Sequence, residues 1–181
     1  AFKVNIDENL KPGRYPLILI AYYTDANSYP FTSISAISLI YKEPTPMMLR
    51  AVVNPVEIQS NGNGTLKVVV ANIDSKPHDI SIRLYLPNEF KSDNYKNEIY
   101  LESGGDKQIE FQVSSLGALE GSTYIVLISM EYEDNLHYSS TASGTIAISK
   151  SGNTVESKWK SSVIVVAVLL LIIFVYYQFR K

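Results

Sequence analysis

A domain-sized repeat constrains this chain more than any other feature of its sequence. The segment YPLILIAYYTD at residues 15–25 returns as YIVLISMEYED at residues 124–134. Placing Phe2 on Phe111 sets an offset of 109 residues, and this offset holds without a gap as far as residue 148. Such a period exceeds the roughly 20 to 50 residues of solenoid repeats, so each copy is expected to be a complete fold by itself.

The second copy predicts an antiparallel β-sandwich. Ile80, Ile82 and Leu84 alternate with Ser81 and Arg83, the period of two expected where one sheet face is buried and the other is wet. About seven short strands in about one hundred residues, without a competing amphipathic helix, are typical of a two-sheet immunoglobulin-like sandwich. The expected strands cover residues 49–53, 66–71, 80–86, 98–101, 109–113, 124–132 and 143–149.

The repeated tyrosines have a structural interpretation. Tyr15 and Tyr124 each follow a glycine-containing turn and open the sixth strand of their copy. A tyrosine at this place commonly bonds through its hydroxyl to the loop backbone while its ring enters the core. The apolar run that follows is expected to be a central strand buried on both faces over part of its length.

The first copy is incomplete. Residues 1–42 match only the last three strands of the second copy, which predicts roughly four further strands upstream of Ala1. The other side of its central strand, at Ile18, Ile20 and Tyr22, is more apolar than the equivalent residues of the second copy. These residues are expected to pack against the absent half, another domain or a partner.

The C-terminal end predicts a membrane anchor. Residues 161–179 carry no charge, and as a helix they cover roughly 28 Å, close to the ~30 Å thickness of the bilayer hydrocarbon. Trp159, Tyr176 and Tyr177 stand where interfacial aromatic side chains are expected. The expected organisation is a partial first sandwich at 1–42, a proline linker at 43–47, a complete sandwich at 48–149, a tether at 150–160, the transmembrane helix at 161–179 and a cytoplasmic tail at 180–181.

Composition excludes several classes of partner. Residues 1–150 hold 12 Lys and Arg against 17 Asp and Glu, a net charge of 12 − 17 = −5, and nucleic-acid binding requires a basic face instead. The chain has no cysteine, so it has neither disulfides nor a thiolate metal site. Charge around the predicted helix does not decide orientation, and the extracellular placement of the sandwiches follows from their domain type.

No catalytic, cofactor or metal site is predicted. His78 and His137 have no nucleophile or metal-ligand partner at an informative spacing. Glu131, Glu133 and Asp134 lie near one loop, but calcium needs more oxygen ligands on a dedicated loop, so a solvated acidic turn is favoured.

Two features suit recognition at a cell surface. Asn63, in the sequence Asn-Gly-Thr, is an acceptor for N-linked glycosylation. Exposed rings such as Tyr85, Tyr95 or Tyr100 could stack on sugars, although tyrosine is also common in strands for packing reasons.

The segments LKVVVANIDSKPHDISIRLYLP, IEFQV and GSTYIVLISMEYED resemble immunoglobulin-like domains of the CARDB (cell-adhesion-related) and alpha-galactosidase-associated kinds. The shared motif is a strand ending in V-x-N, followed by an alternating strand ending in Leu-Pro. Tandem copies with a C-terminal membrane helix are similar to archaeal S-layer-like surface proteins. The resemblance implies spacing and adhesion, and it carries no catalytic residues.

The sequence therefore predicts a non-enzymatic, single-pass cell-surface protein whose tandem sandwiches act as spacers or interaction modules, with other surface proteins or glycans as partners. The alternative is an accessory subunit that binds a glycan or protein within a membrane transport, secretion or surface-enzyme complex.

Overall fold

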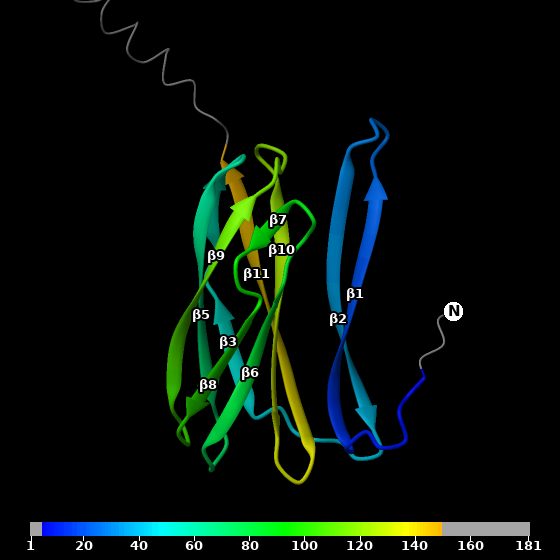
Figure 1. Cartoon of the computed structure of the whole chain (residues 1–181), viewed down its shortest axis with the longest axis vertical. Coiled ribbons are helices and arrows are strands. Elements are labelled where there is room, and N and C mark those ends of the chain that lie inside the picture. The colour runs from blue at the N-terminus through cyan, green and yellow to red at the C-terminus, as the bar shows by residue number, and fades with distance from the viewer. Residues whose placement is uncertain (1–4, 150–181) are drawn as a thin grey trace, which may run out of the picture. The chain divides into compact units, whose positions relative to one another are not determined.

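The described part of the chain is an all-β structure. The computed structural model describes residues 5–149, and it contains eleven strands there (Figure 1). The alternating segments of the sequence form seven of them, and the first copy supplies two more. The strands are β1 (Gly13–Thr24), β2 (Pro30–Tyr41), β3 (Leu49–Val53), β4 (Val56–Gln59), β5 (Asn63–Asn72), β6 (His78–Tyr85), β7 (Phe90–Ser92), β8 (Lys96–Leu101), β9 (Asp106–Ser115), β10 (Thr123–Glu133) and β11 (His137–Ser149).

The strands form the two packed sheets of an immunoglobulin-like sandwich. One sheet has the order β3-β5-β9-β7, and the other has the order β2-β1-β11-β10-β6-β8, with β4 also paired to β11. The first strand of the sandwich divides at Pro55: β3 pairs with β5 in one sheet and β4 runs parallel to β11 in the other. Each sheet thereby gains an edge strand from one segment of chain, which helps to close the core.

The core lies between the sheets, where the predicted alternation places it. Ile80, Ile82 and Leu84 are at most 2% exposed, while Ser81 and Arg83 lie on the outer face. In β10 the residues Val126–Met130 are all buried, as expected of a strand covered on both faces. Tyr124 is also buried, and its hydroxyl oxygen accepts a hydrogen bond from the Leu119 amide at 3.0 Å. The predicted tyrosine role in the second copy is confirmed.

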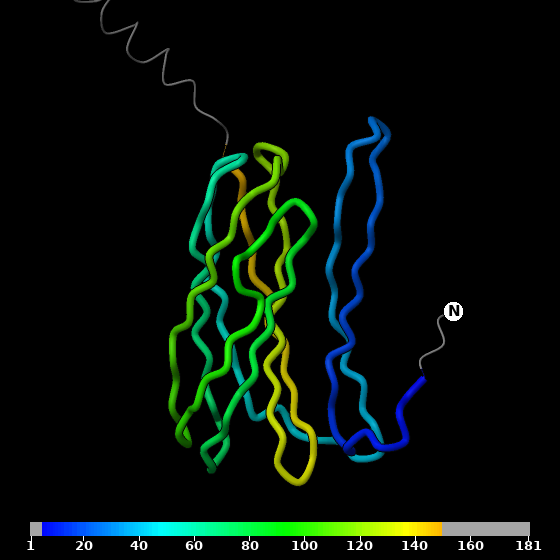
Figure 2. Tube along the Cα trace, in the orientation of Figure 1, coloured from blue at the N-terminus to red at the C-terminus, as the bar shows by residue number. Residues whose placement is uncertain are grey.

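The first copy forms a long hairpin, β1–β2, that stands beside the sandwich (Figure 2). Tyr15 again bonds to nearby backbone, because its hydroxyl donates to the Lys11 carbonyl oxygen at 2.7 Å. The pairing differs from the β10–β11 hairpin by two residues: Tyr15 pairs with Leu39, whereas Tyr124 pairs with Ile146 and not with residue 148. Side chains keep their faces, since a shift of two preserves strand alternation.

The base of the hairpin is joined to the sandwich at several points. Gly13 pairs with His137 in a parallel contact between β1 and β11. The Arg14 guanidinium donates to the Thr45 carbonyl oxygen at 2.9 and 3.0 Å, and the buried Thr45 hydroxyl donates to the His137 carbonyl oxygen at 3.2 Å. Farther from the base of the hairpin, Ile34 is 5% exposed and lines a small hollow together with Leu127 of β10.

The side of the hairpin that carries Ile34 therefore faces the sandwich. Ile20 pairs with Ile34 and Tyr22 pairs with Thr32, so Ile18, Ile20 and Tyr22 lie on this same side. Only Ile34 is buried on this side, whereas Ile20 is 41% exposed and Tyr22 is 62% exposed. The packing partner of Ile20 and Tyr22 therefore stays a prediction.

The described residues, 5–149, all belong to one compact unit. Among them, no helix has the length and apolar character that a membrane span requires. The predicted tether, transmembrane helix and tail, with Trp159, Tyr176 and Tyr177, lie outside the described residues, as does the part of the first copy around Phe2. These predictions stay predictions.

Candidate functional site

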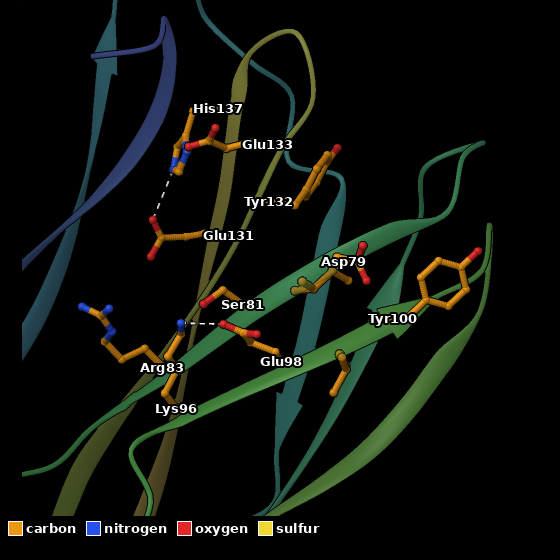
Figure 3. A pocket seen from close by; sticks show the side chains of 12 residues that line it. Asp79, Ser81, Arg83, Lys96, Glu98, Tyr100, Glu131, Tyr132, Glu133 and His137 are labelled. Atoms are coloured by element: carbon orange, nitrogen blue, oxygen red, sulfur yellow. Dashed lines mark hydrogen bonds and ion pairs between the residues drawn. The ribbon is translucent and has the colours of Figure 1, made fainter. Parts of the chain in front are cut away.

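The outer face of β8, β6 and β10 carries an open, polar hollow of about 650 Å³ (Figure 3). Strand alternation builds it, because the residues between the buried isoleucines of β6 must point outward. The neighbouring strands contribute side chains to the same face. The labelled residues around the hollow are Asp79, Ser81, Arg83, Lys96, Glu98, Tyr100, Glu131, Tyr132, Glu133 and His137.

His137 lies at one end of this hollow, between two carboxylates. Its Nε2 lies 3.2 Å from Glu131 Oε2, and its Nδ1 lies 3.6 Å from Glu133 Oε1. The ring is stacked on Tyr15 at a centroid distance of 3.9 Å. Burial alone would raise the pKa of Glu131, but its hydrogen bond with His137, the charge of His137 and a hydrogen bond from Ser129 hold that pKa below its usual value.

The rest of the hollow has mixed charge. Lys96 Nζ lies 2.6 Å from Glu98 Oε1, and both side chains are largely exposed. Exposed ion pairs of this kind contribute little to stability, so they remain available to exchange with a ligand. Tyr100 is 53% exposed at the edge. An aromatic ring beside donors and acceptors of both signs suits a polar ligand such as a sugar or an extended peptide.

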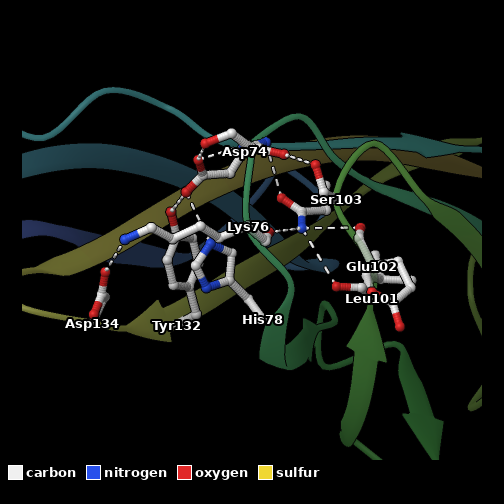
Figure 4. Close-up of polar contacts among 10 residues, drawn as sticks. Asp74, Lys76, His78, Leu101, Glu102, Ser103, Tyr132 and Asp134 are labelled. Atoms are coloured by element: carbon white, nitrogen blue, oxygen red, sulfur yellow. Dashed lines mark hydrogen bonds and ion pairs between the residues drawn. The ribbon is translucent and has the colours of Figure 1, made fainter.

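The second histidine belongs to a separate network at the end of β5 and the start of β6 (Figure 4). His78 Nε2 lies 2.8 Å from Asp74 Oδ2, and the Tyr132 hydroxyl donates to the same oxygen at 3.2 Å. His78 is also stacked on Tyr132, at 3.9 Å. The hydrogen bond with His78 is the main cause of the lowered pKa of Asp74, while burial and then the Asp74 charge raise the pKa of Tyr132.

Asn72 ties this network to the next turn. Its side-chain amide donates to the carbonyl oxygens of Lys76 at 2.7 Å, Glu102 at 3.1 Å and Leu101 at 3.4 Å. Its Oδ1 accepts from the Asp74 amide at 3.0 Å. Because Asn72 is 1% exposed, these bonds satisfy backbone groups at the end of the sandwich. The asparagine of the V-x-N motif thus has a structural role.

The acidic residues near the β10–β11 turn have different partners. Glu131 and Glu133 flank His137, and Asp134 lies 3.7 Å from Lys76 Nζ. Glu133 also lies 3.2 Å from Lys11 Nζ. Within residues 5–149 no group of three or more His, Cys, Asp or Glu side chains is placed to hold a metal ion.

The other predicted surface residues are dispersed. Tyr100 borders the polar hollow, whereas Tyr85 and Tyr95 do not line it. Tyr95 is 44% exposed, and its hydroxyl oxygen accepts from the Ser92 amide at 3.0 Å. Asn63 is exposed at the first position of β5.

Sequence reasoning missed the carboxylate partners of both histidines, and it missed Glu89. Glu89 is 9% exposed, and neither carboxylate oxygen has a hydrogen-bond partner among the described residues. The spacing of Asp74 and His78, four residues apart outside a helix, gave no signal. Glu89 follows a Leu-Pro-Asn turn, a position where an exposed side chain is the ordinary expectation.

Comparison of the sequence with protein-family models and with curated proteins found no match. Among solved structures, the ASH/PapD-like domain 7 of human CEP192 has 10% identity and a TM-score of 0.40, over 62% of this chain and 94% of that domain. The E. coli chaperone DraB has 13% identity and a TM-score of 0.39, over 56% and 55%. E. coli alpha-2-macroglobulin has 11% identity and a TM-score of 0.45, over 76% of this chain and 8% of its own.

Proposed function

We propose that this protein is a membrane-anchored cell-surface protein, S-layer-like in organisation, whose tandem immunoglobulin-like sandwiches act as spacers or interaction modules. In this proposal residues 161–179 form the single membrane span. The sandwiches lie outside the cell, Arg180 and Lys181 lie inside, and the chain has no enzymatic activity. The partners are other surface proteins or glycans.

One observation carries the proposal: the hairpin β1–β2 exposes the side that forms the core in its repeat. The core side of β10 carries Tyr124, Val126 and Ile128, and the equivalent side of β1 carries Tyr15, Leu17 and Leu19. In the sandwich this side is covered by the sheet β3-β5-β9-β7.

On the hairpin the same side is covered at its base, where Tyr15 is stacked on His137, but not farther along. Leu19 is 41% exposed and Ile37 is 51% exposed. An apolar sheet face of this kind marks an interaction surface. We propose that its occupant is the second sheet of an adjoining sandwich, because that is what covers the repeat of this hairpin. A tandem array with shared hairpin junctions would make a spacer.

The anchor in this proposal depends on the sequence. Residues 161–179 are uncharged and long enough to cross the hydrocarbon layer. The interfacial aromatic residues Trp159, Tyr176 and Tyr177 support the same assignment.

Cysteine labelling tests the topology, since the chain has no cysteine of its own. Glu120→Cys places a thiol at an exposed turn of the sandwich, and Lys181→Cys places one at the end of the predicted tail. We expect a membrane-impermeant maleimide to label Glu120→Cys on intact cells, and to label Lys181→Cys only after permeabilisation. The reverse pattern, or release of the protein from membranes by an alkaline carbonate wash, would refute the proposed anchoring.

The polar hollow supports the second candidate, an accessory subunit that binds a glycan or an extended peptide. Tyr100 and the exchangeable pair Lys96 and Glu98 are the observations in its favour. A glycan-binding assay with Tyr100→Ala tests this role, with Tyr95→Ala as the matched exposed tyrosine outside the hollow. Equal binding by both variants and the unmodified protein would exclude the hollow as the site.

A further inference from the structure

A second hollow, of about 710 Å³, lies between the tip of the hairpin and one end of the sandwich. Hydrogen bonds cross it at two places: the Tyr29 hydroxyl donates to the Gly117 carbonyl oxygen at 3.0 Å, and the Asn88 amide donates to the Thr32 hydroxyl at 3.4 Å. Its volume is in the range of small-molecule sites, roughly 300 to 1,000 Å³. The two walls are thus held in a fixed relation that could receive a ligand.

The hairpin wall of this hollow is aromatic. Tyr22, Tyr23, Tyr29 and Phe31 all line it. Phe31 contacts both Tyr23 and Tyr29, at centroid distances of 5.7 and 5.2 Å, while Tyr22 stays 62% exposed. The turn is fixed by Asp25, whose Oδ1 accepts from the amides of Asn27 and Tyr29 at 2.9 and 2.8 Å. Aromatic faces of this kind attract organic cations.

The sandwich wall contributes a buried carboxylate. Glu89 lines the hollow, is more than nine-tenths buried, and its two carboxylate oxygens accept no hydrogen bond from any described residue. None of the ion pairs within residues 5–149 includes it. Among the described residues, the Leu116 amide donates to the backbone carbonyl oxygen of Glu89 at 2.7 Å. A buried charge is costly without a partner of opposite sign, so the hollow has a place for positive charge.

We propose that this hollow binds an alkylammonium group, with the aromatic residues of the hairpin tip against its methyl or methylene groups and the Glu89 carboxylate compensating its charge. The group is either a free organic cation or the end of a lysine side chain of a partner protein. This site goes beyond the proposed spacer function and does not depend on it.

The test uses the full-length chain purified in a maltoside detergent, because choline-headed detergents would compete. Isothermal titration calorimetry measures binding of choline, of its neutral isostere 3,3-dimethylbutan-1-ol, and of N-acetyl-lysine methylamide. Three variants accompany the unmodified chain. Glu89→Gln removes the carboxylate charge and keeps the shape of the side chain, and Tyr22→Leu removes an exposed ring. Glu110→Gln is the control, because it makes the same charge change at an exposed residue of β9, outside the hollow.

We expect a cation to bind saturably and the neutral isostere to bind about tenfold more weakly or worse. Glu89→Gln and Tyr22→Leu should each weaken cation binding severalfold, while Glu110→Gln leaves it unchanged. Tighter binding of choline than of the lysine derivative indicates a free cation, and the reverse order indicates a protein side chain. Absence of saturable binding, equal affinity for the neutral isostere, or unaltered affinity in folded Glu89→Gln would overturn the proposal. If Glu89→Gln does not fold, unaltered affinity in Tyr22→Leu would overturn it.

Discussion

Asn72 offers the sharpest test of how the sandwich is held together, because one side chain satisfies backbone groups in two separate turns. The three shorter of its four hydrogen bonds measure 2.7, 3.0 and 3.1 Å. Each such bond contributes about 1 kcal/mol net, and removing one partner leaves the other buried and unsatisfied. We therefore expect Asn72→Ala to lower the free energy of unfolding by about 3 kcal/mol, a large part of the ~5 to 15 kcal/mol of a typical domain.

Urea unfolding of the purified chain measures this loss. The signal should be the near-ultraviolet circular dichroism of the tyrosines, because the single tryptophan, Trp159, lies outside the described sandwich. With a slope of about 1 to 3 kcal/mol per molar urea, the midpoint should fall by roughly 1 to 3 M. The matched control is Asn54→Ala, an exposed asparagine for which a change within about 0.5 kcal/mol is expected.

Asn72→Asp adds a second arm to this test. The substitution keeps the oxygen that accepts from the Asp74 amide, but it turns an oxygen toward the carbonyl groups of Lys76 and Glu102. We expect it to destabilise the sandwich at least as much as Asn72→Ala at neutral pH. A loss below about 1 kcal/mol for Asn72→Ala, or an equal loss for Asn54→Ala, would refute the reasoning.

Three further predictions follow from other contacts. The pKa of Asp74 is lowered in the folded protein, so its carboxylate stabilises the fold above the unfolded pKa of about 3.9, and this stabilisation is lost as the pH falls through the folded pKa. The difference in stability between the unmodified chain and Asp74→Asn should therefore shrink on acidification. Urea midpoints measured across the pH range check this, and a constant difference would contradict it. Gly13→Ala should detach the hairpin from the sandwich, because Gly13 has φ +146° and an added Cβ would collide with the His137 backbone. Hydrogen exchange should become faster at the His137 amide, which donates to the Pro12 carbonyl oxygen, and stay unchanged at the Ile128 amide. Unaltered exchange at the His137 amide would argue against this junction. Asn63 should carry a glycan when the chain is exported from a host that performs N-glycosylation, so Asn63→Gln should lower the intact mass by one glycan; equal masses would exclude the site.

The sandwich could be predicted because its strands obey simple alternation. Their alternation with polar residues predicts a buried face at Ile80, Ile82 and Leu84, and all three are buried in the structure. The short strands β4 and β7, of four and three residues, carry too little periodic signal to be found. The repeat correctly predicted a second hairpin of the same kind, but it could not reveal the change in register. Residues 25–29 connect β1 to β2, two more residues than connect β10 to β11, and a shift of two keeps every side chain on its face.

The candidate sites could be predicted much less well. His137 lies beside Glu131 and Glu133 because a tight turn folds β11 back on β10. Spacings of six and four residues in the sequence do not predict this contact. Asn72 reaches backbone about 30 residues away in the chain. Glu89 follows a turn, and the hairpin tip and the Leu116 loop lie next to it. The contacts of Asn72 and Glu89 join segments that are far apart in the chain, and local sequence patterns do not encode such contacts.

The central claim is that a partner covers the apolar side of β1–β2 in the native membrane, although this side is exposed in the isolated chain. Ile37→Cys places a thiol on that side, and Glu120→Cys places one on the exposed sandwich turn. The measurement is the rate of maleimide labelling at both positions, in the native membrane and in the chain purified in detergent. The account predicts that Ile37→Cys reacts severalfold more slowly in the native membrane than after purification, while Glu120→Cys reacts equally in both. Equal rates for Ile37→Cys in the two settings would contradict it.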